Sequence, residues 1–284
     1  MNEIDAGHGL AGRCVIVTGG GASPGRVASV GEAVARLLAA EGARVVIADR
    51  DRAGAEATLA KLEHAGGSGL AVEADLTDEA QCRRVVERAV EVFGRLDGLV
   101  NNVGIGAGAT VHKADEAEWD LAMSVNVKTA LFMTKHAVPS MTEGGAIVML
   151  STTAVRTPAA SAAYSATKAA LEGLSRQVAL QYGPDGIRCN AVRPGEVWTA
   201  MVDRHCDTEE KAEALRAERA RRTALRREGD AWDIARTVVF LTGQGGRWIT
   251  GQTLSVDGGA GLLRPNDGWT EHHSYWKADE ARRR

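Results

Sequence analysis

The stretch RCVIVTGGG at residues 13–21 decides the fold of this chain. Its first five residues, 13–17, are mostly apolar and β-branched, which predicts a buried strand. A glycine-rich turn follows, and residues 32–41 then have the apolar spacing of a helix that ends at Gly42. A second apolar run at 43–49 predicts another strand. This order of strand, glycine-rich turn, helix and strand is typical of a unit that binds a dinucleotide.

The predicted unit has features that suit a dinucleotide. Glycines let the backbone approach the pyrophosphate, and the helix N-terminus offers free N–H groups and the positive end of a dipole. Asp49 closes the second strand, where a carboxylate can accept hydrogen bonds from the ribose hydroxyls of adenosine. The same carboxylate would repel the extra phosphate of NADP. For a nicotinamide dinucleotide this carboxylate favours NAD over NADP, although Arg50 and Arg52 follow directly and could compensate in part, or Arg50 could stack on the adenine.

Strands and helices are predicted to alternate along the rest of the chain. The further strands are expected at 69–75, 96–100, 146–150, 187–192 and 253–257, and the further helices at 79–93, 116–136, 207–227 and 233–241, with one more around residue 164. Such alternation indicates one doubly wound parallel sheet, and therefore a single-domain, Rossmann-like α/β fold. The domain is expected to span residues 1–284, with a core at about 10–262, a substrate loop and helix at 198–230, and a C-terminal tail at 263–284.

The composition argues against several functional classes. Of the 284 residues, 44% are hydrophobic and 25% are charged, which is ordinary for a globular protein with a full core. The net charge of −3 gives no reason to expect nucleic acid or a membrane surface as a partner. The four cysteines are scattered and have no histidine cluster beside them, so they predict reduced packing residues in a cytoplasmic protein and no metal site. No apolar run approaches the ~20 residues that a bilayer span needs.

The stretch SAAYSATKAAL at 161–171 contains a candidate for catalysis. Tyr164 and Lys168 are four residues apart in an alanine-rich, helix-prone run, so both lie on one face of the predicted helix. A nearby ammonium lowers the pKa of a phenol from its usual value of about 10, and a phenol tuned in this way can exchange a proton with an alcohol or a carbonyl. Alone, the pair would indicate a buried aromatic beside a solvated charge, so its meaning depends on the rest of the chain.

Over roughly residues 10–262 the chain resembles the short-chain dehydrogenase/reductase family. The matching features occur in the family's order: Thr18-Gly19 with a later Gly31, Asp49, Asp75, Asn101-Asn-Val-Gly104, Asn126, hydroxyls at 151 and 152, Tyr164-x-x-x-Lys168, Pro194-Gly195 with Thr199, and Asp257-Gly-Gly. The resemblance implies a nicotinamide cofactor and hydride transfer between an alcohol and a ketone. It also implies a homo-oligomer, either a tetramer or a dimer.

The resemblance assigns a role to each site residue. Tyr164 would exchange the proton, Lys168 would lower its pKa and hold the nicotinamide ribose, and Asn126 would hold a water that links Lys168 to solvent. A hydroxyl, from Ser151 or Thr152, would orient the substrate oxygen. The residues implied to contact the cofactor are Gly19, Gly25, Ser29, Val30, Gly31, Asp49, Arg50, Asp75, Leu76, Asn102, Val103, Gly104, Tyr164, Lys168, Pro194, Gly195, Val197 and Thr199.

The glycine-rich turn departs from the family's usual TGxxxGxG. Gly19 and Gly31 are 12 residues apart instead of 6, and Ser29 stands where the middle glycine usually stands. The loop before Ser29 is therefore about six residues longer than usual. Its glycines and Arg26 could fold over the pyrophosphate, or the loop could be a surface insertion, and the sequence leaves both alternatives open.

The catalytic hydroxyl is the second departure. The family's usual serine lies 13 residues before the tyrosine, which selects Ser151. Counting along the strand at 147–150 instead matches the family's two serines to Ser151 and Thr152, and then Thr152 would be catalytic. We favour Ser151, because serine is the family's usual residue, and keep Thr152 as the alternative.

The substrate is weakly specified by the sequence. An arginine-rich run at 216–227 could attract an anionic substrate, but five acidic residues at 207–218 favour a solvated helix instead. Arg156, just after the hydroxyls, is the better candidate for binding an anion. The leading hypothesis is an NAD-dependent oxidoreductase of a small secondary alcohol or ketone. A dihydrodiol dehydrogenase, a 3-oxoacyl-carrier reductase and a non-catalytic sensor that binds the cofactor are the alternatives.

Overall fold

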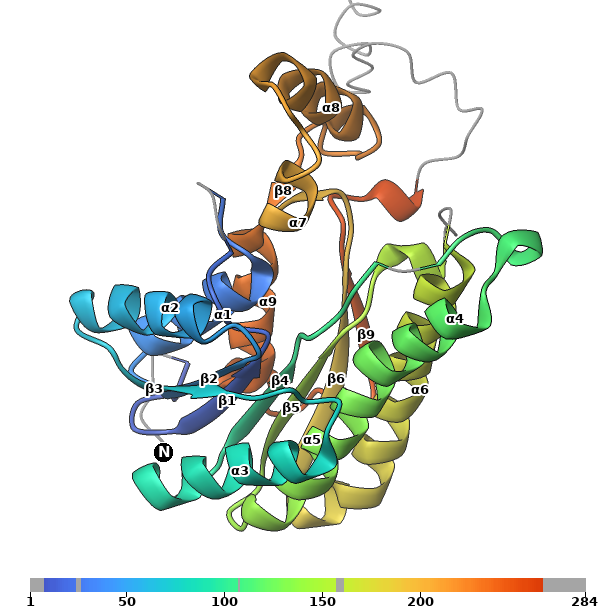
Figure 1. Cartoon of the computed structure of the whole chain (residues 1–284). Helices are drawn as coiled ribbons and strands as arrows, with labels where there is room; N and C mark the ends of the chain where they lie inside the picture. The colour runs from blue at the N-terminus through green and yellow to red at the C-terminus, as the bar shows by residue number, and fades with distance from the viewer. Residues whose placement is uncertain (1–7, 24–26, 107, 157–160, 263–284) are drawn as a thin grey trace, which may run out of the picture.

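The computed structural model describes residues 8–23, 27–106, 108–156 and 161–262. Within these ranges, seven parallel strands form one sheet in the order β3-β2-β1-β4-β5-β6-β9 (Figure 1). The strands are β1 (Cys14–Thr18), β2 (Arg44–Asp49), β3 (Ser68–Glu73), β4 (Gly98–Asn101), β5 (Gly145–Leu150), β6 (Ile187–Pro194) and β9 (Thr253–Val256). The chain runs outward from β1 to β3 and then returns to the other side of β1, so the strand order reverses between β1 and β4. Ligands of such sheets bind at this reversal, outside the carboxyl ends of the strands.

Helices cover both faces of the sheet. The helices α1, α2 and α9 pack on one face, and α3, α5 and α6 pack on the other (Figure 1). The helices are α1 (Val30–Ala40), α2 (Arg52–His64), α3 (Glu79–Phe93), α4 (Glu116–Met123), α5 (Thr129–Ala137), α6 (Ala162–Tyr182), α7 (Ala200–Asp203), α8 (Glu209–Arg221) and α9 (Ala231–Thr242). Short 3-10 turns are η1 (Val111–Lys113), η3 (Val138–Ser140), η4 (Thr153–Val155), η5 (Gly183–Asp185), η6 (Gln244–Gly246) and η7 (Ala260–Leu262).

The position of β1 inside the sheet explains why its sequence is an almost continuous apolar run. Side chains alternate between the two faces of a strand, so Val15 and Val17 join one core and Cys14 and Ile16 join the other. Both cores are closed by helices, and all five residues of β1 are buried. A parallel strand covered on both faces needs apolar residues along most of its length, which is the pattern that predicted it.

The predicted single-domain, doubly wound fold is confirmed, and the differences are local. Helix α2 was not predicted, because only Leu62 among its buried residues is a large apolar side chain, and Gly54, Ala55 and Thr58 give a weak periodic signal. The helix expected at 116–136 is interrupted by a π turn, η2 (Ser124–Lys128). The sequence also gave no signal for the short ribbon of β7 (Val197–Trp198) and β8 (Gly229–Asp230), on the side of the molecule where α7 and α8 lie (Figure 1).

Candidate functional site

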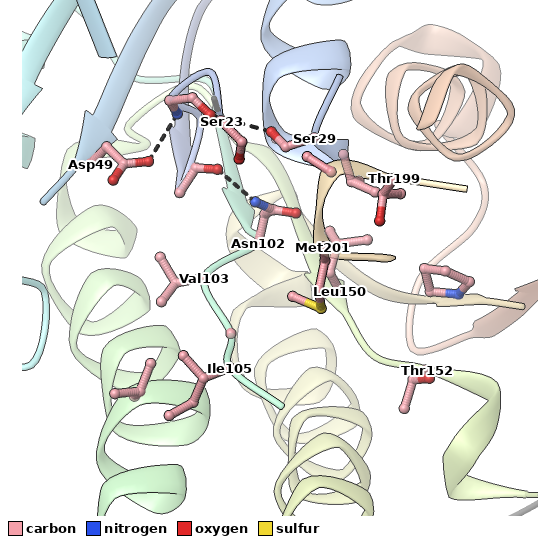
Figure 2. Close-up of a pocket in the computed structure, with 18 of the residues that line it drawn as sticks. Ser23, Ser29, Asp49, Asn102, Val103, Ile105, Leu150, Thr152, Thr199 and Met201 are labelled. Atoms are coloured by element: carbon pink, nitrogen blue, oxygen red, sulfur yellow. Dashed lines mark hydrogen bonds between the residues drawn. The ribbon is translucent and has the colours of Figure 1, made fainter. Parts of the chain in front are cut away.

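A cavity of about 630 Å³ opens at the carboxyl ends of the strands. Its wall combines the turn after β1 with the segments that follow β2, β3, β4, β5 and β6, together with α6 and α7. Figure 2 shows Asp49 at one end of this wall and Thr152 at the other. The cavity therefore joins the predicted nucleotide-binding end to the predicted catalytic end.

The turn between β1 and α1 brings two pieces of backbone into close contact. Gly19 has a left-handed φ of +62°, and a Cβ on Gly31 would lie only 2.1 Å from the Gly19 carbonyl oxygen. Ser29 caps α1, since its Oγ accepts from the Glu32 N–H at 3.1 Å and donates to the Gly21 carbonyl at 3.3 Å (Figure 2). The N-terminus of α1 thus faces the cavity with a glycine beside its free N–H groups, which suits an anionic group. Gly25 and Arg26 lie outside the described residues.

Asp49 is fixed at the end of β2 by two backbone N–H groups. Its Oδ2 accepts from the Gly21 N–H at 2.9 Å (Figure 2), and its Oδ1 accepts from the Asp51 N–H at 3.0 Å. A Cβ on Gly21 would lie 2.8 Å from Oδ2, so this approach requires glycine. Gly21 was not among the predicted cofactor residues, because its partner is 28 positions away in the sequence.

The next strands close the nucleotide end of the cavity. Asn102, at the end of β4, donates from Nδ2 to the carbonyls of Thr18 at 3.1 Å and Gly19 at 2.9 Å (Figure 2). Asp75 accepts from the N–H and the hydroxyl of Thr77, and these hydrogen bonds lower the pKa of the Asp75 carboxyl. Asn102 thus couples β4 to the glycine turn, and Asp75 remains a carboxylate at the cavity wall.

Tyr164 and Lys168 lie on α6, as predicted. Ser161 caps the helix by accepting from the Tyr164 N–H at 3.1 Å, which places the tyrosine in the first turn. Lys168 is only 4% exposed, its Nζ donates to the Leu150 carbonyl at 2.8 Å, and it lies 6.0 Å from the centre of the Tyr164 ring. A Cβ on Gly104 would lie 2.7 Å from this Nζ, so a larger residue there would push the lysine head group aside.

Burial governs the pKa values of both groups. Burial lowers the pKa of Lys168 to about 8. It raises the pKa of the Tyr164 phenol, and a hydrogen bond with Thr152 opposes this rise. The predicted net lowering of the phenol's pKa by Lys168 is therefore wrong for the chain by itself, because desolvation of the phenol is the larger effect.

The two candidate hydroxyls have different partners. Ser151 is 4% exposed, and its Oγ donates to Glu172 Oε1 at 2.7 Å and to the Lys168 carbonyl at 3.2 Å. The Thr152 hydroxyl instead accepts from the Ala154 N–H at 3.3 Å and, from the cavity wall, lowers the pKa of the Tyr164 phenol. These contacts favour Thr152, the alternative chosen by the strand register, over Ser151, which the spacing to Tyr164 selected.

Asn126 lies in the π turn η2 and is fully buried. Its Oδ1 accepts from the Ile105 N–H at 2.7 Å, and its Nδ2 donates to the Ile105 carbonyl at 3.1 Å and to Thr167 Oγ1 at 3.0 Å. The side chain thus holds the segment after Gly104 against α6. Asn126 does not line the cavity, and its predicted water link to Lys168 stays a prediction.

The cavity gathers most of the predicted site. Apart from Gly25, all the residues implied to contact the cofactor line it, and so do Ser151 and Thr152. Further lining residues were not among the predicted cofactor contacts, and they are either neighbours of a motif residue or members of the predicted substrate loop and helix at 198–230: Gly21, Ser23, Ala74, Thr77, Ile105, Val125, Thr129, Leu150, Ala200, Met201, Val202, Arg204 and Arg219. Arg156 does not line the cavity.

The arginine-rich helix α8 is tied to the β7–β8 ribbon. Arg219 pairs with Glu196 at 3.1 Å and with Glu228 at 2.5 Å, while the guanidinium of Arg216 stacks over the Trp198 ring at 4.4 Å. Arg219 is the member of the run that reaches the cavity, and two carboxylates already compensate its charge. The structure therefore favours a structural role for these two arginines over binding of a substrate anion.

Comparison with known proteins places this site in a family. A family model described as "Enoyl-(Acyl carrier protein) reductase" matches residues 25–261. An uncharacterized oxidoreductase of Methylorubrum extorquens is 39% identical over 253 residues, covering 88% of this chain and 98% of the relative. The L-rhamnose 1-dehydrogenase (NAD(P)(+)) of Azotobacter vinelandii is 38% identical, with 88% of this chain and 97% of the relative covered.

A solved structure agrees with these relatives. The crystal structure of a putative short-chain dehydrogenase/reductase from Burkholderia xenovorans matches with a TM-score of 0.85 at 37% identity, covering 91% of this chain and all of that one. A parallel sheet with a nucleotide-sized cavity at its switch point and a Tyr-x-x-x-Lys helix on the cavity wall defines a dinucleotide-dependent oxidoreductase. The chain belongs to the short-chain dehydrogenase/reductase family, whose dehydrogenases use nicotinamide cofactors.

Two further properties concern the part of the chain that the structure describes. None of its helices is long and apolar enough to cross a membrane. Among the same residues, no three histidine, cysteine or acidic side chains gather as a metal-binding group.

Proposed function

We propose that the protein is an NAD-dependent oxidoreductase of small secondary alcohols or ketones, with Tyr164 as the general acid and base. The observation that carries this proposal is the single cavity that holds Asp49 and the glycine turn at one end and Thr152, Tyr164 and Lys168 at the other. A hydride carrier that spans the cavity would bring its reactive end to the tyrosine. The cytoplasm and a homo-oligomeric state remain part of the proposal by family analogy.

The residues present fit a nicotinamide dinucleotide. Gly31 packs against Gly19 with no room for a Cβ, so the backbone at the helix N-terminus stays accessible to a pyrophosphate. Asp49 is held where it can accept from the ribose hydroxyls, and Asp75 and Leu76 are proposed to meet the adenine. Pro194, Gly195, Val197 and Thr199, which follow β6 or lie at its end, would meet the carboxamide. When bound, the cofactor supplies or accepts the hydride.

The protein's own part is the handling of one proton. Tyr164 donates its phenolic proton to the substrate oxygen in reduction and takes it back in oxidation. Thr152 lines the cavity together with Tyr164, so its one hydroxyl proton can be donated to the substrate oxygen. Lys168, when charged, stabilises the phenolate that forms, because it is buried and screened little by water.

The preference for NAD rests on Asp49. Its carboxylate lines the cavity at the end of β2, where the extra phosphate of NADP would meet a like charge. Arg50 lines the same region and offsets part of this repulsion. The relative from Azotobacter vinelandii is named as a dehydrogenase that uses NAD(P)(+). Similarity at this level therefore does not decide between NAD and NADP, and the proposal depends on Asp49.

A panel of secondary alcohols with NAD and of ketones with NADH tests the proposal. The panel includes dihydrodiols and 3-oxoacyl thioesters, which cover the alternative substrates, and turnover is followed by the absorbance of the reduced nicotinamide. Turnover on some members supports the proposal and identifies the substrate class. Tight binding of NADH without turnover on any member would contradict it and favour a sensor that binds the cofactor.

A further inference from the structure

A buried ion pair lies directly behind the catalytic end of the cavity. Glu172 is one helical turn beyond Lys168 on α6, and Arg193 is near the end of β6. The Arg193 Nε donates to Glu172 Oε1 at 2.6 Å, and a second guanidinium nitrogen donates to Oε2, so the pair is bidentate. The Glu172 side chain is 5% exposed and the Arg193 side chain is 16% exposed, and neither residue lines the cavity.

Such a pair needs good geometry to be tolerated. Removing a carboxylate and a guanidinium from water costs several kcal/mol for each ion, which the mutual attraction offsets only when the remaining lone pairs are also satisfied. Here the Ser151 hydroxyl provides a third hydrogen bond to the carboxylate, at 2.7 Å. Glu172, on α6, thus accepts hydrogen bonds from Arg193 on β6 and from Ser151 at the end of β5.

The hydrogen bonds that surround the pair connect it to the catalytic residues. Ser151 also donates to the Lys168 carbonyl at 3.2 Å, and the Lys168 Nζ donates to the Leu150 carbonyl at 2.8 Å. Thr152 follows Ser151 directly and lines the cavity together with Tyr164. The end of β5 and the catalytic turn of α6 are therefore joined at several points, next to β6 (Figure 1).

We propose that Glu172 and Arg193 are positioning residues that hold the end of β5 and the catalytic turn of α6 in register. Glu172 receives Ser151 and thereby orients the next residue, Thr152, toward Tyr164. Arg193 holds the carboxylate in that position from β6. A displacement of about 1 Å between reacting groups can cost a large factor in rate, so a support of this kind acts on turnover and less on affinity. This inference rests on the proposed function, since it assigns a task to Thr152 and Tyr164.

The test compares Glu172→Gln with a matched control, Asp97→Asn. Asp97 is also buried, 7% exposed, and binds two arginines, Arg13 and Arg95, but it precedes β4 at the opposite end of the sheet. Both variants replace a buried carboxylate by its amide, so both should lower Tm. We expect Glu172→Gln to lower kcat by about tenfold while the KM for substrate and the Kd for NADH stay within about twofold. Asp97→Asn should keep kcat within about twofold.

A second variant covers the case in which Glu172→Gln does not fold. Ser151→Ala removes one hydroxyl and leaves the ion pair, and it should lower kcat by roughly three- to tenfold with a smaller loss of Tm than Glu172→Gln. A kcat within twofold of the unmodified protein in Ser151→Ala, and also in Glu172→Gln where that variant folds, would overturn the inference. An equal loss of kcat in Asp97→Asn would overturn it too, because the effect would then be a general loss of stability. Turnover that survives in Tyr164→Phe would instead refute the proposed function, so the two failures are distinguishable.

Discussion

The choice of coenzyme depends on one carboxylate whose surroundings the structure defines. Two unit charges 4 Å apart interact by about 1 kcal/mol in bulk water and by about 4 kcal/mol at the effective dielectric near a protein surface. Asp49 is half-buried, so its repulsion of a ribose phosphate should fall between these values, and Arg50 reduces it further. We therefore predict that kcat/KM favours NAD over NADP by at least about tenfold, or about 1.4 kcal/mol.

Three variants distinguish the effect of the Asp49 carboxylate on coenzyme choice from the effect of other charges nearby. Asp49→Ala should shrink or invert the ratio of kcat/KM for the two coenzymes. Gly21→Ala should also shrink it, because the new Cβ would lie 2.8 Å from Asp49 Oδ2 and would displace the carboxylate. Asp51→Ala is the control, since Asp51 is exposed, does not line the cavity and makes no side-chain cap to α2. The assay measures kcat/KM with each coenzyme at one saturating substrate concentration.

Two results would contradict the prediction about the coenzyme. An unmodified protein that prefers NADP would refute the role given to Asp49, because the arginines would then outweigh it. A ratio that Asp51→Ala changes as much as Asp49→Ala does would show that the net charge of the region decides, and not the carboxylate at the cavity wall.

Three further predictions concern the site. Thr152→Ala should lower kcat by about a hundredfold and Ser151→Ala by roughly tenfold or less, and the reverse order would return the catalytic role to Ser151. Gly31→Ala should weaken NADH binding in a fluorescence titration by at least about tenfold, since its Cβ would lie 2.1 Å from the Gly19 carbonyl oxygen, and unchanged binding would contradict this packing argument. Burial lowers the pKa of Lys168 from 10.5 to about 8, so the unfolded chain binds more protons between these values and the folded state gains stability as the pH rises through them. Urea unfolding of the coenzyme-free protein should show that Lys168→Met removes about 2 kcal/mol of the stability gained between about pH 7 and pH 9.5, and equal gains in both proteins would refute the buried position of the lysine.

The sheet and the nucleotide end of the site were predictable because their signals are local. The strands around Asp49 are continuous apolar runs, and the glycine turn stands between a strand and a helix in the order that the fold requires. Helix α2 was missed since small residues such as Ala55 form most of its buried face. The π turn at Asn126 was missed because it depends on hydrogen bonds to Ile105, which lies 21 residues earlier in the chain.

The catalytic end was harder to predict, because neighbouring residues on a strand point in opposite directions. A shift of one position therefore separates Ser151, which bonds Glu172, from Thr152, whose hydroxyl lowers the pKa of the Tyr164 phenol. The sequence contains both hydroxyls but not the register that distinguishes them. Desolvation of the phenol, which raises its pKa, likewise depends on the packing of the whole cavity wall and not on the spacing to Lys168.

The most direct test of the central claim is the turnover of Tyr164→Phe. This variant removes the phenolic hydroxyl and keeps the ring, so the fold and the binding of NADH should survive. Steady-state kinetics on the best substrate of the panel, combined with a Kd for NADH, separates chemistry from binding. We predict a fall in kcat of at least about 10²-fold with a Kd within about twofold of the unmodified protein. A kcat close to that of the unmodified protein would contradict the account, because the proton would then have another donor.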